Sequence, residues 1–495
     1  MPKPCPHHSR TMWSGPYGQA GCFSAPNMRG LLAFARALGA MSLAAVLLAI
    51  PMGCSSVSDR TAAPPTPDSA EAAEIAKDAF IFGLPLVTVD ITRRRTITGP
   101  NVEMNKFIHD FSFPDADFRT FVRPNVDTFY SNAFLDLTPG PVEVFLPEMG
   151  SRFHMLQLMD AYTNVFGVPG TRTTGNGGGT FFITGPGWKG QAPAGVREVY
   201  HSPTNHVWIL GRTHIYGAQD GQGSARPLME QYGLTPTEGE HAADFDLGAI
   251  TLEDDANSIV AQMPLNVFFD YLNHLMLIDP PAEADREILT RMAKIGIGPH
   301  AQSDPVRFGA GEEAAIKANV LATLGRSSLP MVNGWQTTME GGVGNFGTNY
   351  ALRANISLFG LGANLPEDAV YFTRARDENG DPLDGSDRKY VLRFESAQDL
   401  PPAKAFWSLT VYQNNFLYGN EIDRYAVGSV LSDLVENLDG SVEIYIQNEN
   451  PGGGRENNWL PIPSGPFDMT MRVYLPGDAL LENIWKVPQL ESYEK

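Results

Sequence analysis

The sequence predicts a mainly β protein in which a helical segment joins two jelly-roll-like β-sandwich domains. First, 49 Gly and 38 Pro among 495 residues exceed average usage and indicate many turns. Second, short apolar runs separated by turn sequences recur over 120–250 and 365–495, a spacing typical of sandwiches. Third, apolar residues between these stretches follow helical spacing. We therefore expect an N-terminal sandwich over 68–250, helices over 251–330 and a C-terminal sandwich over 331–495.

Residues 1–54 have the pattern of a leader that directs export. A segment with two arginines is followed by an apolar run over 37–52, and the small Gly53 precedes Cys54. Because the apolar run is short for a membrane span, it predicts a signal peptide. The arrangement resembles a bacterial lipoprotein signal with Cys54 as the lipidated residue. We expect a protein of the periplasm or cell envelope that contacts the membrane only through this anchor, with 55–67 as a polar linker.

The individual elements follow from capping residues, periodicity and turn sequences. The first helix is predicted to begin after Asp68, which can cap it, and to end at Gly83 and Pro85. Strands are predicted over 142–146, 153–160, 181–183 and 207–210. Helices are predicted over 256–278, 282–295 and 312–324. Strands return over 390–394, 406–412, 442–446 and 469–474.

Charge and cysteine usage exclude several classes of protein. The formal net charge is −20, which argues against nucleic acid or anionic lipid as the main partner, because both require basic patches. The three cysteines all lie within the leader. The globular body therefore has no disulfide framework, thiolate zinc site or cysteine nucleophile.

A polar run interrupts a strand-like stretch at 123–137. Polar side chains are costly in a core unless they are hydrogen-bonded or used in chemistry. One hypothesis places Asp127 and Tyr130 in a pocket with Asp160 as catalytic residues and Asn125 as a ligand-binding neighbour. Two carboxylates in one cleft can divide acid and base roles, as in glycoside hydrolysis. The alternative is a structural Asp127 that accepts backbone N–H groups at a strand entrance.

Four further residues are candidates for ligand binding. Tyr350 and Arg353 are one helical turn apart, so their side chains are expected to point the same way. Arg353 has the geometry to bind a substrate carboxylate or to neutralise Asp127, and a structural ion pair between domains is the alternative. Asn164 and Trp335 complete the set, although aromatic residues of this kind more often belong to a core.

Metal and cofactor signals are weak, and the cofactor stays unknown. The segment 377–385 is rich in oxygen ligands that suit calcium, but its glycine placement departs from an EF-hand loop. A hairpin turn is the alternative, since Asn-Gly and Asp-Gly favour one. His206 and His214 share parity along a predicted strand. Without an H-E-x-x-H motif, hydrogen-bonded histidines are the default interpretation, and no metal ligand is assigned.

Several motifs together resemble a pair of bacterial families. Residues 123–130, 160–166 and 185–188 look like the domain-of-unknown-function family numbered 1254. Residues 345–354 join it to the partner family numbered 1214, which is marked at 383–385, 405–410, 424–425 and 458–461. The resemblance covers about 70–490. It implies tandem sandwiches with helices between them, in exported or envelope proteins, and it carries no established activity.

These observations predict an exported envelope protein of unassigned activity. Our primary hypothesis is a hydrolase or a binding protein for a small molecule or glycan. The alternative is a non-catalytic structural or assembly protein of the envelope. A homo-oligomer is compatible with both.

Overall fold

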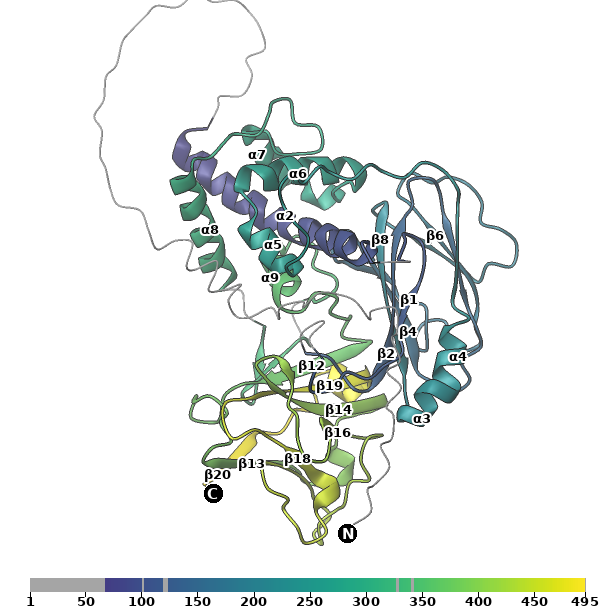
Figure 1. The fold of residues 1–495 in the computed structure, drawn as a ribbon, viewed down its shortest axis with the longest axis vertical. Coiled ribbons are helices and arrows are strands. Elements are labelled where there is room, and N and C mark those ends of the chain that lie inside the picture. The colour runs from purple at the N-terminus through teal and green to yellow at the C-terminus, as the bar shows by residue number, and fades with distance from the viewer. Residues whose placement is uncertain (1–66, 100–101, 119–122, 326–328, 340–341, 495) are drawn as a thin grey trace, which may run out of the picture.

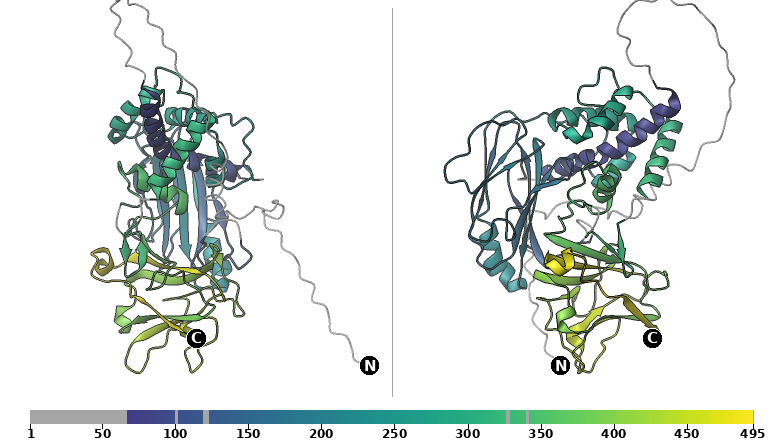
Figure 2. Two further views of the ribbon diagram at one scale, coloured as in Figure 1. Left: turned by 90° about the vertical axis from the view of Figure 1, so that its left-hand side faces the viewer. Right: turned by 180° about the vertical axis from the view of Figure 1, so that it is seen from behind.

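The computed structural model describes residues 67–99, 102–118, 123–325, 329–339 and 342–494 (Figure 1). Within them the protein is mainly β, with two sandwich domains and a group of helices, which confirms the predicted fold class. Figure 2 shows the helices above and beside the first sandwich, and the C-terminal sandwich below both. The leader and Cys54 lie outside the described residues.

The N-terminal sandwich packs a five-stranded sheet, in the order β1-β2-β8-β4-β5, on a four-stranded sheet, in the order β7-β6-β3-β9. The strands are β1 (Ile108–Asp110), β2 (Thr128–Asp136), β3 (Val142–Leu146), β4 (His154–Asp160), β5 (Val165–Gly167), β6 (Gly179–Thr184), β7 (Glu198–His201), β8 (His206–His214) and β9 (Gly233–Pro236). Three short helical elements follow β8, namely α3 (Ala218–Asp220), η1 (Gly221–Ala225) and α4 (Arg226–Met229). The predicted end of β8 at Leu210 is wrong, because Gly211 continues the ladder opposite Ser131.

The C-terminal sandwich packs a seven-stranded sheet on a four-stranded one. The larger sheet has the order β10-β11-β12-β19-β14-β15, with β16 also paired to β14, and the smaller has the order β18-β17-β13-β20. The strands are β10 (Met331–Val332), β11 (Trp335–Thr337), β12 (Ala369–Arg374), β13 (Arg388–Phe394), β14 (Ala403–Gln413), β15 (Phe416–Leu417), β16 (Ala426–Gly428), β17 (Val442–Gln447), β18 (Trp459–Pro461), β19 (Asp468–Pro476) and β20 (Leu490–Glu494). Short helices η4 (Ala397–Asp399), η5 (Glu456–Asn458) and α10 (Asp478–Leu481) lie in its connections.

The helical group surrounds one long helix, α2 (Ser69–Ile97). Its other members are α5 (Ala256–Gln262), α6 (Leu265–Ile278), η2 (Glu283–Asp285), α7 (Arg286–Met292), η3 (Ala293–Ile295), α8 (Ala310–Leu324) and α9 (Tyr350–Phe359). The predicted helix over 256–278 is divided at Pro264, which caps α6 and lacks the N–H that a continuous helix requires. Among the described residues, no helix combines the length and the apolar character needed to cross a bilayer.

Helix α2 corrects the prediction that the first helix ends at Gly83 and Pro85. Asp68 caps it as expected, through backbone N–H groups of Ala70 and Glu71. Gly83 instead serves packing, because a Cβ there would lie 2.6 Å from the side chain of Leu272 in α6. The helix therefore continues past Pro85 and packs against α5, α6, α8 and α9.

The five-stranded sheet has two faces with different neighbours. Leu135, Leu158 and Ile209 point into the core of the first sandwich. Successive residues of a strand alternate between faces, so Tyr130, Phe134 and the other even-numbered residues of β2 point outward. This outer face is covered at one end by α2 and at the other by the C-terminal sheet.

Candidate functional site

Two polar sheet faces meet where the domains join. Tyr130 of β2 lies opposite Arg212 of β8 on the outer face of the first sandwich. In the C-terminal domain, Tyr371 of β12 lies opposite Arg472 of β19, which in turn lies opposite Ser408 of β14. Opposed residues of antiparallel strands share a face, so these side chains line the same boundary. We call this boundary the seam.

Five residues at the seam form a group of two cations and three phenols, here called the seam cluster. They are Tyr130, Arg212, Tyr371, Arg472 and Tyr474. The Arg212 guanidinium carbon lies 5.6 Å from the centroid of the Tyr130 ring, and that of Arg472 lies 6.0 Å from the Tyr371 ring. The charges of both arginines act on Tyr130 and on Tyr474. The cluster therefore belongs to both domains.

The two arginines are buried and keep their charge. Burial opposes the charged form of Arg212 and Arg472, but the surrounding tyrosines, and Asp127 for Arg472, more than offset it, so both pKa values are raised. Burial also raises the pKa of Tyr130 and Tyr474, so both phenols stay neutral at physiological pH. Among the described residues neither arginine forms an ion pair. The seam thus holds two positive charges without an ion-paired carboxylate.

Part of the hydrogen-bonding capacity of the cluster is unused. Within the described part of the chain, Arg212 Nε and the Tyr474 hydroxyl are buried without a hydrogen-bond partner. Arg212 donates to Gln157 Oε1 at 3.4 Å and to the Gly362 carbonyl at 3.3 Å, and it also shares a hydrogen bond with the Tyr130 side chain. A buried donor without a partner is costly, and most such groups in proteins are satisfied. An acceptor placed at these positions would therefore satisfy both groups.

Arg374 shows that a buried arginine alone does not define such a site. It lies in the C-terminal domain, 1% exposed, against the Trp335 ring. Its guanidinium donates to the carbonyl oxygens of Arg376, at 2.8 Å, and Asn333. Backbone acceptors therefore satisfy Arg374, whereas Arg212 Nε has no partner among the described residues.

Three of the residues predicted from the sequence lie at the seam. Asn125 accepts the backbone N–H groups of Asp127 and Thr128, each at 2.9 Å, and its amide donates to the Tyr130 hydroxyl at 2.5 Å. The Asp127 carboxylate accepts a 2.7 Å hydrogen bond from the Ser408 hydroxyl. Burial raises the pKa of Asp127, opposed by that hydrogen bond and by the charge of Arg472. This carboxyl therefore neutralises the cluster less than its formal charge implies.

A second group lies where β4 meets α9. Asp160 accepts the backbone N–H groups of Tyr162 and Asn164 at 2.9 and 2.8 Å, and the Asn164 amide at 3.0 Å. The Arg353 guanidinium carbon is 5.3 Å from each of three ring centroids, those of Phe82, Tyr162 and Tyr350. Burial raises the pKa of Asp160 to about 6, opposed by Asn164 and by the charge of Arg353. Arg353 Nε and Nη2 have no hydrogen-bond partner in the described residues, so the cation–π contacts with the three rings are its main stabilising interactions.

The structure does not form the carboxylate pair that the hydrolase hypothesis requires. Asp160 lies beside Val207 near the start of β8, whereas the Asp127 carbonyl accepts the N–H of Ile215 just past its end. Those positions are eight residues apart, which is roughly 25 Å along a strand. Asp127 and Asp160 therefore do not share a cleft, and Arg353 accompanies Asp160 instead of Asp127.

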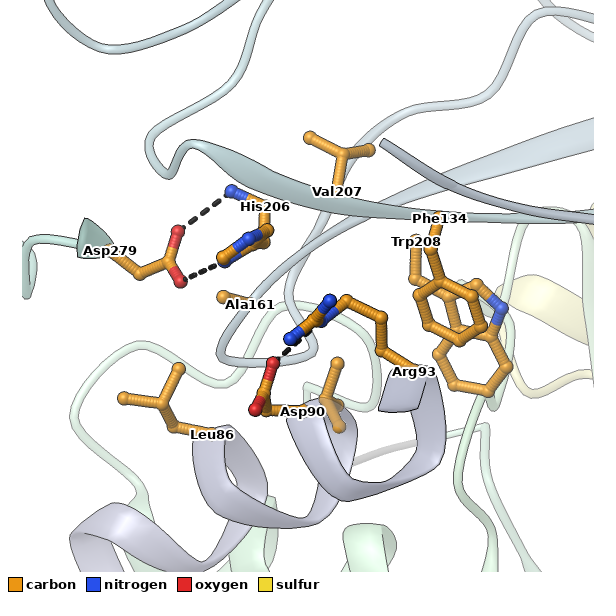
Figure 3. A pocket seen from close by; sticks show the side chains of 10 residues that line it. Leu86, Asp90, Arg93, Phe134, Ala161, His206, Val207, Trp208 and Asp279 are labelled. Atoms are coloured by element: carbon orange, nitrogen blue, oxygen red, sulfur yellow. Dashed lines mark hydrogen bonds and ion pairs between the residues drawn. The ribbon is translucent and has the colours of Figure 1, made fainter. Parts of the chain in front are cut away.

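The helix-covered end of the outer face carries a different polar group (Figure 3). A cavity of about 10 Å³, the size of one water, lies among His206, Asp279, Asp90 and Arg93. His206 donates its backbone N–H to Asp279 at 2.7 Å, and its ring Nδ1 lies 2.8 Å from the same carboxylate. Arg93 donates to Asp90 at 2.7 Å and pairs with Asp244. Every charge of this group has a partner.

The remaining predicted residues lie elsewhere. Trp335 is fully buried in the core of the C-terminal sandwich and donates to the Pro488 carbonyl at 2.9 Å. In the segment proposed for calcium, Asp377 pairs with Arg388 and accepts the N–H groups of Asn379 and Asp381. No group of three or more His, Cys, Asp or Glu side chains in the described residues is placed to hold a metal ion.

Comparison with family models agrees with this two-part architecture. Residues 104–236 match the model of a protein of unknown function, DUF1254, and residues 368–478 match DUF1214, also of unknown function. The chain thus carries one region that matches DUF1254 and a second that matches DUF1214. The DUF1254 match covers the first sandwich, with Tyr130 and Arg212, and the DUF1214 match covers Tyr371, Arg472 and Tyr474. Each family region thus supplies part of the seam cluster.

Two solved structures resemble this chain. The VPA0106 protein from Vibrio parahaemolyticus is 22% identical, with a TM-score of 0.65 over 85% of this chain and all of that one. An uncharacterised protein from Burkholderia cenocepacia is 11% identical, with a TM-score of 0.43 over 86% of this chain and 96% of that one. The Vibrio parahaemolyticus structure supports the fold described for this chain. No curated protein matches the chain.

Sequence reasoning missed most of the seam cluster. In β19, Thr470, Arg472 and Tyr474 alternate with Met469 and Met471, a pattern that ordinarily marks a strand with one solvent-facing side. The polar side faces the DUF1254 region instead. The available signal was that an arginine and a tyrosine, large side chains suited to interfaces, occupied that side.

Proposed function

We propose that this protein binds a small anion at the seam, between Arg212 and Arg472. The observation that carries the proposal is that Arg212 and Arg472 are buried without an ion pair in the described residues, beside an unpartnered Arg212 Nε and an unpartnered Tyr474 hydroxyl. Arg472 already donates to Thr410, Tyr412 and the Arg123 carbonyl, so the open donors belong to Arg212 and Tyr474. Guanidinium groups match carboxylate and phosphate oxygens in fork geometry, and neutral phenols donate to the same oxygens. Within the predicted class of small molecules or glycans, we therefore favour an anion.

The arrangement supports binding better than hydrolysis. Asp127 is buried and held by Ser408, and Asp160 is held by two backbone N–H groups and Asn164. Neither is paired with a second carboxylate across a cleft, which acid–base cleavage of a glycoside requires. The polar groups instead resemble a preorganised set of donors with its acceptor missing.

The test is calorimetric titration with acetate and with sulfate at constant ionic strength. Wild type is expected to bind one of these anions, and Arg212→Met and Arg472→Met are expected to lose that binding. Arg212→Lys, which keeps the charge but not the fork, should bind more weakly. Arg374→Met removes a buried arginine whose donors are already used, so it should bind as wild type does. Equal binding by all variants, or none by wild type, would favour the structural or assembly role.

We propose the cell envelope as the place of this function, on the support of the leader pattern alone. Cys54→Ser is the direct test of lipid attachment. It should move the protein from the membrane fraction to the soluble periplasmic fraction, whereas Cys22→Ser should leave it in the membrane fraction.

A further inference from the structure

A groove lies beside the seam cluster and differs from it in chemistry. It has a volume of about 350 Å³, within the range of small-molecule pockets. Val165, Val343, Leu365 and Pro366 supply its apolar lining, and the exposed Asn345 lies at it. That volume holds on the order of ten non-hydrogen atoms, given about 30 Å³ for a water.

One short segment separates the groove from the cluster. The Gly362 carbonyl accepts from Arg212, and Asn364 donates to Gln157 Oε1 at 2.6 Å and accepts from the Tyr371 hydroxyl at 2.7 Å. The next residue, Leu365, lines the groove and packs against the apolar group that contains Tyr474. The segment thus contacts the seam cluster on one side and the groove on the other.

The charges of the groove suit a neutral ligand portion. Its one lining cation, Arg172, is held by Asp368 through two hydrogen bonds of 2.7 and 2.8 Å. Glu367, also at the groove, is exposed and would repel a second negative charge. An anionic group is therefore favoured at the cluster and disfavoured at the groove.

We propose that the ligand is a monocarboxylate with a neutral, largely apolar body that occupies the groove. Its carboxylate lies between Arg212 and Arg472, and Asn364 and Leu365 shift to admit it. A single charge fits because burying a dianion costs more than burying a monoanion. This inference rests on the proposed anion-binding function and adds to it the class of ligand.

The experiment is a calorimetric series with acetate, butyrate, hexanoate and octanoate. Affinity is expected to rise about threefold to fourfold per added methylene, as for transfer of that group from water. Hexanamide, which keeps the body and lacks the charge, should bind at least tenfold more weakly than hexanoate. Asn345→Trp places an indole at the groove without disturbing the core, and should abolish the rise while acetate still binds. Thr348→Trp, at a nearby exposed position outside the groove lining, is the matched control and should keep the rise.

The outcomes separate this inference from the proposed function. Arginine-dependent acetate binding without a rise along the series would overturn the groove assignment and leave the anion site standing. A rise of the same size in wild type, Asn345→Trp and Arg212→Met would indicate non-specific apolar binding and overturn it also. Failure of every carboxylate to bind in an Arg212-dependent way would overturn the monocarboxylate assignment, and failure of sulfate as well would remove the anion site.

Discussion

The outer face of the first sandwich has buried cations at both ends. These cations are ion-paired at one end and not at the other. Under the helices, Arg93 pairs with Asp90 and Asp244, and His206 pairs with Asp279. At the seam, Arg212 and Arg472 are equally buried but have no ion pair among the described residues. Burial alone is therefore uninformative, because the buried cations under the helices are ion-paired and hold elements together, whereas those at the seam are not ion-paired and form the anion site that we propose. The following predictions test that difference.

The largest effect is expected at the compensated end, from Arg93→Met. The change leaves Asp90 buried with the Tyr271 hydroxyl as its remaining side-chain partner, so the free energy of unfolding should fall by about 3–5 kcal/mol. Urea denaturation measures it. Arg226→Met breaks an exposed pair with Glu230 and should cost less than about 1 kcal/mol. A similar small cost for both would show that the helix-covered pairs are not structural.

Asp160 lies beside the start of β8, at the end of the sheet that the helices cover, and its pH dependence is the next largest effect. Its pKa is raised from 3.8 to about 6 on folding, chiefly by burial. The folded state therefore binds this proton more tightly, so its contribution to stability is present below pH 3.8 and lost as the pH rises through about 6. The loss is about 3 kcal/mol in the free energy of unfolding.

Denaturation of wild type and Asp160→Asn between pH 4 and pH 7 measures this loss. The variant should show a flatter profile, because it cannot titrate. In the Arg353→Met variant, the midpoint pH of this stability loss should be higher than in wild type, because the Arg353 charge lowers the pKa of Asp160. An identical slope in wild type and Asp160→Asn would assign the pH dependence to other groups.

At the uncompensated end, Arg212→Met should change the free energy of unfolding by no more than about 1 kcal/mol. Replacing an unpaired buried charge with an apolar side chain of similar length is often neutral or stabilising. In thermal denaturation, acetate should raise the melting temperature of wild type and leave that of the variant unchanged. Destabilisation as large as that of Arg93→Met would show that the seam is also compensated.

The smallest effect comes from removing single hydroxyls at the seam. Tyr474→Phe should leave stability unchanged, because the Tyr474 hydroxyl has no partner in the described residues. Tyr412→Phe should cost about 1 kcal/mol, because that hydroxyl donates to the Pro124 carbonyl and accepts from Arg472. Urea denaturation of the two variants measures both. Equal costs would mean that the Tyr474 hydroxyl is already satisfied.

The sequence determines the elements more fully than their contacts. Turn residues and alternation located the strands, and helical spacing placed Tyr350 and Arg353 on one helix, as α9 shows. The helix end predicted at Gly83 was wrong, because Gly83 packs against Leu272. That partner is 189 residues away in the chain, and local sequence patterns do not reveal it.

The site was less accessible to sequence reasoning because it forms between strands distant in the chain. Asn125, Asp127 and Tyr130 were found, since they sit together in one polar run. Arg472 was missed because it alternates with apolar residues as a solvent-facing residue would, and Arg212 was missed because it follows Gly211, past the predicted end of its strand. Asp127 and Asp160 were placed together because they were expected on neighbouring strands at one pocket, but the register along β8 puts them at opposite ends.

Because both family regions contribute residues to the seam cluster, the cluster depends on the two regions being inherited together. A chain with only the first region would expose Tyr130 and Arg212 to water, and a chain with only the second would expose Tyr371, Arg472 and Tyr474. Neither half brings the two guanidinium groups together. Fission of the gene between the regions would therefore preserve two sandwich folds and abolish the cluster, unless the separate products reassociate along the same polar faces.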